Sequence, residues 1–363
     1  MLCATLAICH DVYNSMVNER TALYETEKKS LTLYDQIPRL AQWKKAHPEL
    51  KEVHSQVLQN VAVRVDLAFQ AFLRRVKNGE TPGYPRLKGH VVYDSITFPQ
   101  LQTGGCKLIG NILQVSKIGQ VKAIAHRPLI GTPKTCTIRR LAGKWFACFC
   151  CDYEPSQFAA VCGEALPTSS ERIGIDVGPS QFAALSDGTF VENPRFFRRD
   201  EKAVARAGRK QSRTAKGTPA RRKAHKVLSR INERIRNRRH DFGHQFARRL
   251  VNQYGLIAVE KLNVKSMVKS HCLAKSISDA SWSMFRSVLS QKAESASRMV
   301  VEVDPAFTSQ DCHKCVNRAK KKLSERWHLC PMCGASLDRD ANAAINILNK
   351  AAVGTHGVVA IAA

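Results

Sequence analysis

Three short acidic motifs, well separated along the chain, constrain the fold more than any other feature. The β-branched run Arg172–Val177 carries Asp176 near its C-terminal end, and the apolar run Leu256–Val259 leads directly into Glu260. A carboxylate at the end of an apolar strand costs free energy unless it is paired or binds a metal ion. Either motif alone is also compatible with a solvated turn residue. Together they predict two strands that deliver their acids to a metal site.

The third motif begins a helix. Asp340 precedes the helical pattern Ala341–Lys350, in which Ala344, Ile345 and Leu348 share one face. Carboxylates from two strand ends and one helix start can hold two hard cations close together. Such a metal pair can activate a water and neutralise the leaving oxygen of a phosphodiester, so the motifs indicate a nuclease centre. Asp338, two residues earlier, is the alternative third carboxylate.

Four cysteines lie between the second and third acidic motifs. They form the sequences CHKC and CPMC, which are separated by 14 residues: Cys312, Cys315, Cys330 and Cys333. This spacing is close to that of a structural zinc ribbon, whose four thiolates complete a closed tetrahedral site. The adjacent His313 and His328 are therefore interpreted as bystanders.

The remaining cysteines and the lack of targeting signals indicate the compartment. Nine further cysteines, among them Cys148, Cys150 and Cys151, lack paired ligand spacing and are predicted to be reduced core thiols. The apolar opening Leu2–Cys9 has no basic segment before it, and no apolar run is long enough to span a membrane. We therefore expect a cytoplasmic protein.

The charge distribution points to a polyanionic partner. The formal net charge is +27 over 363 residues, and the segment Arg195–Arg239 holds 18 Lys or Arg against three acidic residues. Such a run is often only a solvated helix face, but here it lies between the first two acidic motifs and can deliver phosphates to them. Thr218 and Pro219 predict the start of a long helix that ends near Gly255. The side chains expected to follow a nucleic-acid backbone are Arg222, Lys226, Arg230, Arg234 and Arg238.

The N-terminal third combines helices with short strands. Apolar residues at helical spacing continue to about Lys77, and Asn78–Gly89 is a basic Gly/Pro-rich linker. The following short strands suggest a small β-barrel: Ser95–Phe98, Lys107–Ile109, Leu113–Val115 and Trp145–Tyr153.

Several motifs in this order resemble one family. They are HSQVLQ (His54–Gln59), GYPRLK (Gly83–Lys88), GIDVG around Asp176, VEKLNV, SISDASW, TSQDCHKC and DRDANAAINIL. With these motifs the chain resembles TnpB, the transposon-encoded OrfB-type proteins related to type V CRISPR effectors, over nearly its whole length.

The resemblance implies a multidomain α/β fold. Its nuclease domain would be RuvC-like, with an RNase H fold and an inserted zinc ribbon, and would follow an N-terminal helical lobe and a small β-barrel. The expected divisions are 1–77 for the helical recognition lobe, 78–168 for the wedge-like barrel with its linkers, 169–304 for the first nuclease part, 305–336 for the zinc ribbon and 337–363 for the second nuclease part.

The resemblance also implies the activity. Asp176, Glu260 and Asp340 would be the catalytic residues, with two magnesium ions, beside one structural zinc. The partners would be a guide RNA and a DNA target, double- and single-stranded, and the protein would be a prokaryotic RNA-guided DNA endonuclease of a transposable element, commonly named a transposase, that works on the nucleoid. The alternatives are a non-cleaving RNA-guided or zinc-ribbon DNA-binding regulator, which would have no use for the three acids, and a decayed transposon copy.

Two further expectations come from the resemblance. The helix with Ser55, Gln56 and Gln59 would face the short duplex beside the target, where a glutamine amide can pair with adenine; an exposed polar helix face is the alternative. Relatives begin with a strand ahead of the first helix, whereas this chain starts inside that helix, so a truncated N-terminus and an incomplete barrel are expected.

Overall fold

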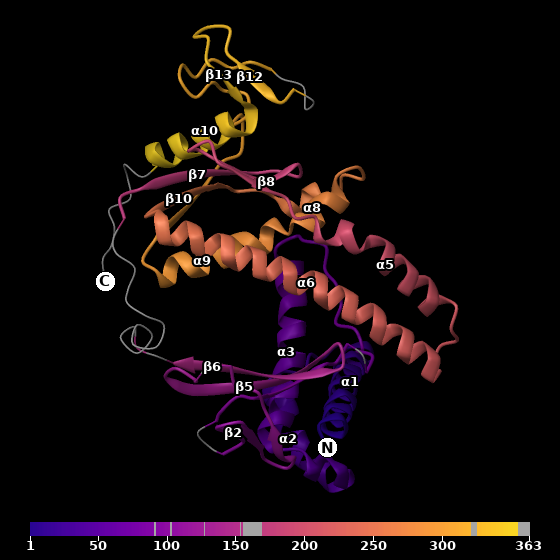
Figure 1. Ribbon diagram of the computed structural model, residues 1–363. Coiled ribbons are helices and arrows are strands. Elements are labelled where there is room, and N and C mark those ends of the chain that lie inside the picture. Colours follow the sequence, from indigo (N-terminus) through magenta and orange to yellow (C-terminus); the bar gives the residue numbers. More distant parts are fainter. Residues whose placement is uncertain are drawn as a thin grey trace. The chain divides into compact units, whose positions relative to one another are not determined.

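The computed structural model describes residues 1–90, 92–101, 104–126, 128–152, 154, 169–320 and 325–354. The chain forms two compact units, Met1–Glu164 and Ala165–Ala363, and each is described by itself (Figure 1). None of the helices in these described ranges combines the length and the apolar character that crossing a membrane requires.

The first unit begins with helices, as predicted. These are α1 (Leu2–Glu27), α2 (Leu33–Ala46), a 3₁₀ turn (Pro48–Glu52) and α3 (Ser55–Lys77). The buried Arg20 of α1 joins them, because its guanidinium donates to Gln36 Oε1 at 2.7 Å and to Asp66 Oδ1 at 3.0 Å. A polar network inside this helical bundle thus fixes the three helices to one another.

The strands of the first unit form two separate antiparallel sheets. One has the order β1-β5-β6 and the other β2-β3-β4. Their bounds are β1 (Ser95–Phe98), β2 (Cys106–Ile109), β3 (Ile112–Val115), β4 (Gly119–Lys122), β5 (Thr132–Leu141) and β6 (Lys144–Asp152). The two sheets share one apolar core, to which Phe98, Val115 and Ile138 contribute. Among the described residues they do not close into the predicted barrel, since β2–β4 pair only with one another.

The second unit is built on one five-stranded mixed sheet with the order β11-β10-β7-β8-β9. The bounds are β7 (Arg172–Val177), β8 (Gln181–Leu185), β9 (Phe190–Glu192), β10 (Leu256–Glu260) and β11 (Met299–Val303). Strands β7, β10 and β11 are parallel, and β7, β8 and β9 form an antiparallel meander. The meander thus begins with the strand that carries Asp176.

Helices cover both faces of this sheet, as Figure 1 shows. The helices of this unit are α5 (Phe196–Ser212), α6 (Pro219–Gln253), α7 (Val264–Met267), α8 (Ala274–Ala280), α9 (Trp282–Ser295) and α10 (Arg339–Gly354). Helix α10 lies on one face, and α6 and α9 lie on the other (Figure 1). On one face, Phe246 of α6 and Phe285 of α9 pack edge-on against Phe182 of β8. On the other face α10 lies so close that a Cβ on Gly174 would be 2.1 Å from Ala344 O. Glycine at position 174 thus permits α10 to contact the sheet backbone.

The four cysteines belong to the connection between β11 and α10. This connection includes a short hairpin of β12 (Trp327–Leu329) and β13 (Ser336–Asp338). Strand β13 continues directly into α10, so the cysteine-bearing segment and the helix that carries Asp340 are one continuous stretch of chain.

Candidate nuclease centre and cysteine cluster

Asp176 and Glu260 lie side by side at the carboxyl ends of two neighbouring parallel strands. Ile175 of β7 is paired with Val259 of β10, so the next residue on each strand is one of the two acids. Both side chains are half-buried. The sheet thus brings together two residues that are far apart in sequence, as the sequence predicts.

Asp340 joins them from the N-terminus of α10. Helix α10 packs on β7, and the carboxylates of Asp340 and Glu260 are close enough to perturb that of Asp176 electrostatically. Asp338 has a different position, because its Oδ1 accepts the backbone N–H groups of Asp340 at 2.8 Å and Ala341 at 3.2 Å. Asp338 therefore caps the helix.

Asp176 is the acid whose charged form the site destabilises most clearly. Burial, followed by the negative charges of Glu260 and Asp340, raises the pKa of Asp176 well above its ordinary value. Burial also raises the pKa of Glu260, although the Thr308 hydroxyl hydrogen-bonded to it acts in the opposite direction. A bound cation would offset the cost of the buried negative charge on Asp176. The carboxylate oxygens of the three acids suit a hard ion such as Mg²⁺.

Two arginines hold Asp340. Arg339 donates to Asp340 Oδ1 from Nε at 3.1 Å and from Nη2 at 3.0 Å. The exposed Arg326 lies with Nη1 at 3.4 Å from Asp340 Oδ2 and donates through Nη2 to Ser180 Oγ at 3.0 Å. These cations fix Asp340 and offer positive charge at the edge of the site.

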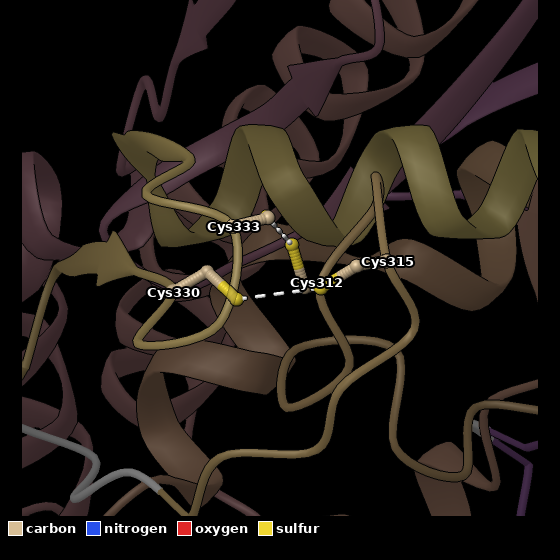
Figure 2. Close-up of side chains that lie close together, drawn as sticks. All are labelled: Cys312, Cys315, Cys330 and Cys333. Atoms are coloured by element: carbon tan, nitrogen blue, oxygen red, sulfur yellow. Dashed lines mark hydrogen bonds between the residues drawn. The ribbon is translucent and has the colours of Figure 1, made fainter.

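The four predicted cysteine ligands converge on one point. Figure 2 shows their side chains directed toward one another beside α10, and their sulfur atoms lie within 4.8 Å of one another. The Sγ atoms are 3.6 Å apart in the pair Cys312 and Cys333 and 3.5 Å apart in the pair Cys315 and Cys330. Four sulfurs around a tetrahedral zinc, each at about 2.3 Å, would be separated by roughly 3.8 Å. The cluster fits zinc.

Backbone hydrogen bonds prepare one of these thiols for a metal. The N–H of Cys333, and then that of Met332, lowers the pKa of Cys330 to about 6. A thiolate is the form that binds zinc. His328 is buried, and His313 donates its backbone N–H to Asn342 Oδ1 at 3.1 Å. Neither histidine belongs to the four-residue cluster.

The basic segment folds into a helical hairpin of α5 and α6. The predicted start of the long helix is confirmed, since Thr218 Oγ1 accepts the N–H of Arg221 at 3.2 Å and Pro219 is the first helical residue. Helical spacing also predicts one packed apolar face along this helix: Val227, Leu228, Ile231, Ile235, Phe242, Phe246 and Leu250. Among these residues only Val227 is exposed, so the expectation is wrong at that position. Val227 is 48% exposed, whereas Phe246 and Leu250 are buried. The C-terminal half of α6 contributes Phe246, Leu250 and Val251 to the core beside the sheet, and α6 also packs against α5 and α9.

The five basic residues predicted to bind nucleic acid divide into two groups. Arg234 and Arg238 both pair with Asp200 of α5, at 2.9 Å and 3.4 Å. Arg222, Lys226 and Arg230 are exposed and follow one another at intervals of four residues, on one helix face. These three are the stronger candidates for phosphate contacts.

Asp279 of α8 anchors this hairpin to the core and was not predicted as a site residue. Its buried carboxylate accepts the N–H groups of Phe197 at 2.8 Å and Arg198 at 3.1 Å, at the start of α5. It also pairs with Arg239 of α6 at 2.9 Å. The available signal was a single acid within the SISDASW motif, between the apolar Ile277 and Trp282.

The predicted duplex-facing residues lie at the start of α3. Ser55 Oγ accepts from Lys44 Nζ at 2.8 Å, Gln56 Nε2 donates to Gln100 Oε1 at 3.3 Å, and Gln59 is exposed. Their contact with a duplex stays a prediction. The interpretation of the other cysteines as core thiols is correct for three buried residues, Cys9, Cys106 and Cys136, and wrong for four exposed ones, Cys3, Cys148, Cys150 and Cys272. Cys151 is half-buried, and Cys162 lies outside the described residues.

Comparison with known proteins identifies the relatives of this sequence. Residues 148–271 match the OrfB_IS605 family, described as a probable transposase, and residues 282–347 match the TNB domain of Cas12f1-like proteins. A Streptomyces pristinaespiralis protein described as "Putative RNA-guided DNA endonuclease" is 33% identical over 345 residues, which cover 93% of this chain and 82% of that protein. InsQ of Escherichia coli (strain K12), with the same description, is 28% identical, and the alignment covers 94% and 86%.

Among solved structures, a cryo-EM structure of the Cas12f1–sgRNA–target DNA complex aligns with 96% of this chain and 94% of its own, at 15% identity and a TM-score of 0.37. The sequence similarity to the Streptomyces protein extends over most of both chains. This chain therefore belongs to the TnpB/OrfB family of RNA-guided DNA endonucleases, and its TNB domain carries the four-cysteine cluster.

Proposed function

We propose that this protein cleaves DNA at sites selected by a guide RNA, and that Asp176, Glu260 and Asp340 form the catalytic centre. The observation that carries this proposal is the convergence of three acids at adjacent strand ends and a helix start. The strand order β11-β10-β7-β8-β9, with an antiparallel meander followed by parallel strands, supports the assignment of an RNase H-like, RuvC-type nuclease domain.

The three carboxylates would hold two magnesium ions. When bound, these ions would activate a water and stabilise the charge on the leaving oxygen of the phosphodiester. The chain's own contribution is placement. Asp176 and Glu260 are fixed by the strand register, and Arg339 orients Asp340. Asp338 would stay outside the metal site, because its carboxylate caps the N-terminus of α10 and its charge acts on Asp176 less than that of Asp340 does.

The α5–α6 hairpin would bind the phosphates of the guide RNA or its duplex with the target. The exposed Arg222, Lys226 and Arg230 supply positive charge at regular spacing. Base pairing would then read the target sequence, and the protein would read only a short flanking motif. In the five-part division expected from the sequence, residues 1–77 and 78–168 would hold the guide and the flanking duplex, and 305–336 would bind zinc.

The first experiment is to purify the chain with its bound RNA, sequence that RNA, and supply a plasmid library with a matching target beside randomised flanks. Cleavage that requires both Mg²⁺ and the matching guide, and is lost in Asp176→Ala, supports the proposal. Guided binding without any cleavage by the wild-type protein would instead support a non-cleaving regulator.

A second experiment tests the hairpin. Replacing Arg222, Lys226 and Arg230 together by alanine should weaken RNA binding for every sequence. The slope of log affinity against log salt concentration should also fall, by the equivalent of up to about three phosphate contacts. Replacing the Asp200-paired Arg234 and Arg238 is the matched control and should change the salt slope less. Unchanged affinity and slope in the triple variant would show that this face is only solvated.

A further inference from the structure

The connection from β11 to the first cysteine pair, residues 304–313, is bound along one face of α10. Asn342, Asn346 and Lys350 are spaced by four residues and therefore share that face. Lys350 Nζ donates to the carbonyls of Asp304 at 3.1 Å and Ala306 at 2.5 Å.

The two buried asparagines hold the remainder of this connection. Asn346 Nδ2 donates to the carbonyls of Thr308 at 2.8 Å and Asp311 at 2.7 Å. Asn342 Nδ2 donates to Asp311 O at 2.8 Å, and its Oδ1 accepts the N–H of His313 at 3.1 Å. Asparagine is unfavourable inside a helix, so two on one apolar helix indicate polar partners that fix them.

Thr308, at the centre of this connection, contacts the candidate nuclease centre. It is 4% exposed, and its hydroxyl donates to Glu260 Oε1 at 2.6 Å. The preceding residue, Phe307, has a φ of 65°. A left-handed conformation is rare for a bulky side chain and persists only when its surroundings enforce it. The backbone is thus strained at Phe307, immediately before Thr308.

We propose that Thr308 is a positioning residue that orients Glu260 for metal binding, and that α10 and the cysteine cluster hold Thr308 in place. The hydroxyl occupies one carboxylate oxygen of Glu260 and leaves the other for the metal. The cluster begins four residues later, at Cys312, in the same bound stretch of chain. This inference rests on the proposed function, because Glu260 must be a metal ligand for its orientation to matter.

The test compares Thr308→Val and Thr308→Ala, which remove the hydroxyl, with Thr308→Ser, which keeps it. Loss of a group that orients a metal ligand typically lowers metal affinity or activity by about 10–100-fold. We expect Thr308→Val and Thr308→Ala to raise the Mg²⁺ concentration for half-maximal cleavage by about tenfold or more, and to weaken Mn²⁺ binding to the full chain in an electron paramagnetic resonance titration. Thr308→Ser should restore both values. Thr189→Val, at an exposed turn, is the matched control.

Zinc content and guide-RNA binding should be unchanged in these variants, which separates positioning from misfolding. A double-mutant cycle tests the connection to α10. Because Asn346 would act through Thr308, adding Asn346→Ala to Thr308→Val should shift the Mg²⁺ midpoint no further. If the double variant instead shifts the Mg²⁺ midpoint by the product of the two single shifts, Asn346 does not act through Thr308.

Glu260→Gln distinguishes a wrong catalytic assignment from a wrong positioning role for Thr308. If Glu260→Gln cuts at the wild-type rate, the proposed catalytic centre is wrong. If Glu260→Gln is inactive but Thr308→Val and Thr308→Ala match the wild type in Mg²⁺ midpoint and Mn²⁺ binding, only the positioning role is overturned.

Discussion

The two candidate metal sites of the second unit are assembled in opposite ways. The cysteine cluster takes its ligands from two neighbouring pairs in one short stretch, and backbone hydrogen bonds favour the thiolate form of Cys330. The carboxylate centre takes its ligands from two strands and a helix, and these ligands repel one another. The cysteine site can therefore organise the chain around it, whereas the carboxylate site depends on a sheet that has already formed.

The largest expected effect concerns the carboxylate centre. Asp340→Ala removes a proposed metal ligand worth several kcal/mol of charge stabilisation, so cleavage should fall by roughly 10²–10⁴-fold while nucleic-acid binding is retained. Asp338→Ala removes only a helix cap, which costs about 1 kcal/mol of stability. Cleavage rates and thermal melting of both variants check this. An active Asp340→Ala beside an inactive Asp338→Ala would reverse the two roles.

The next effect concerns the cysteine cluster. Structural zinc contributes about 10–16 kcal/mol of apparent folding free energy in small finger peptides, so Cys312→Ser or Cys333→Ser should release zinc and lower the yield of folded protein. Cleavage should also fall, because Thr308 would lose its support. Metal analysis with a melting curve measures both, and Cys150→Ser, exposed on β6, is the control. Well-folded protein without zinc would contradict the structural role.

A third variant should separate the two sites. Gly174→Ala would place a methyl group 2.1 Å from Ala344 O and displace α10 from β7. Overpacking of this kind typically costs about 1–3 kcal/mol. We expect slower cleavage with unchanged zinc content. Gly208→Ala in α5, where an added Cβ meets nothing within 4 Å, should be neutral or stabilising. Normal cleavage by Gly174→Ala would show that the position of α10 on the sheet is not critical.

The smallest effect tests the repulsion among the acids. The folded chain raises the pKa of Asp176 above its ordinary 3.8, so without metal the protein loses stability as the pH rises above that value. Asp176→Asn removes this penalty. A gain of about 1 kcal/mol would raise the Tm of the metal-free protein by roughly 2–4 °C at neutral pH, and the gain should vanish at pH 3. A lower Tm at neutral pH would show that the charge of Asp176 is stabilised by other groups.

The contrast between local and distant ligands also explains which residues of the two sites could be predicted from the sequence. The cysteine ligands followed from spacing alone, because all four are local. Asp176 and Glu260 could be proposed because each ends an apolar run, but only the pairing of Ile175 with Val259 shows that they meet. The choice between Asp338 and Asp340 depends on which carboxylate caps α10, and both precede the predicted helical pattern Ala341–Lys350 in sequence.

Three other structural features could not be predicted from the sequence pattern. Strand β5 was missed because it contains Pro133 and buries only Cys136 and Ile138 among polar neighbours. The predicted barrel failed among the described residues because strand pairing between distant segments is not encoded in any one of them. The role of Thr308 was invisible because a threonine four residues before a cysteine is ordinary until its hydroxyl is seen to reach Glu260.

The binding of residues 304–313 along α10 has a consequence for how this segment can evolve. Both ends of the cysteine-bearing insertion are fixed to one helix, by Asn342 and Asn346 at its beginning and by the continuation of β13 into α10 at its end. Residues gained or lost between Cys315 and Cys330 therefore leave the attachment of the insertion unchanged. A single-residue deletion between Thr308 and Cys312 would shift the hydrogen bonds that Asn342 and Asn346 make with Asp311 and His313 out of register. Related proteins should thus differ in the number of residues between Cys315 and Cys330 and keep a constant number between Thr308 and Cys312.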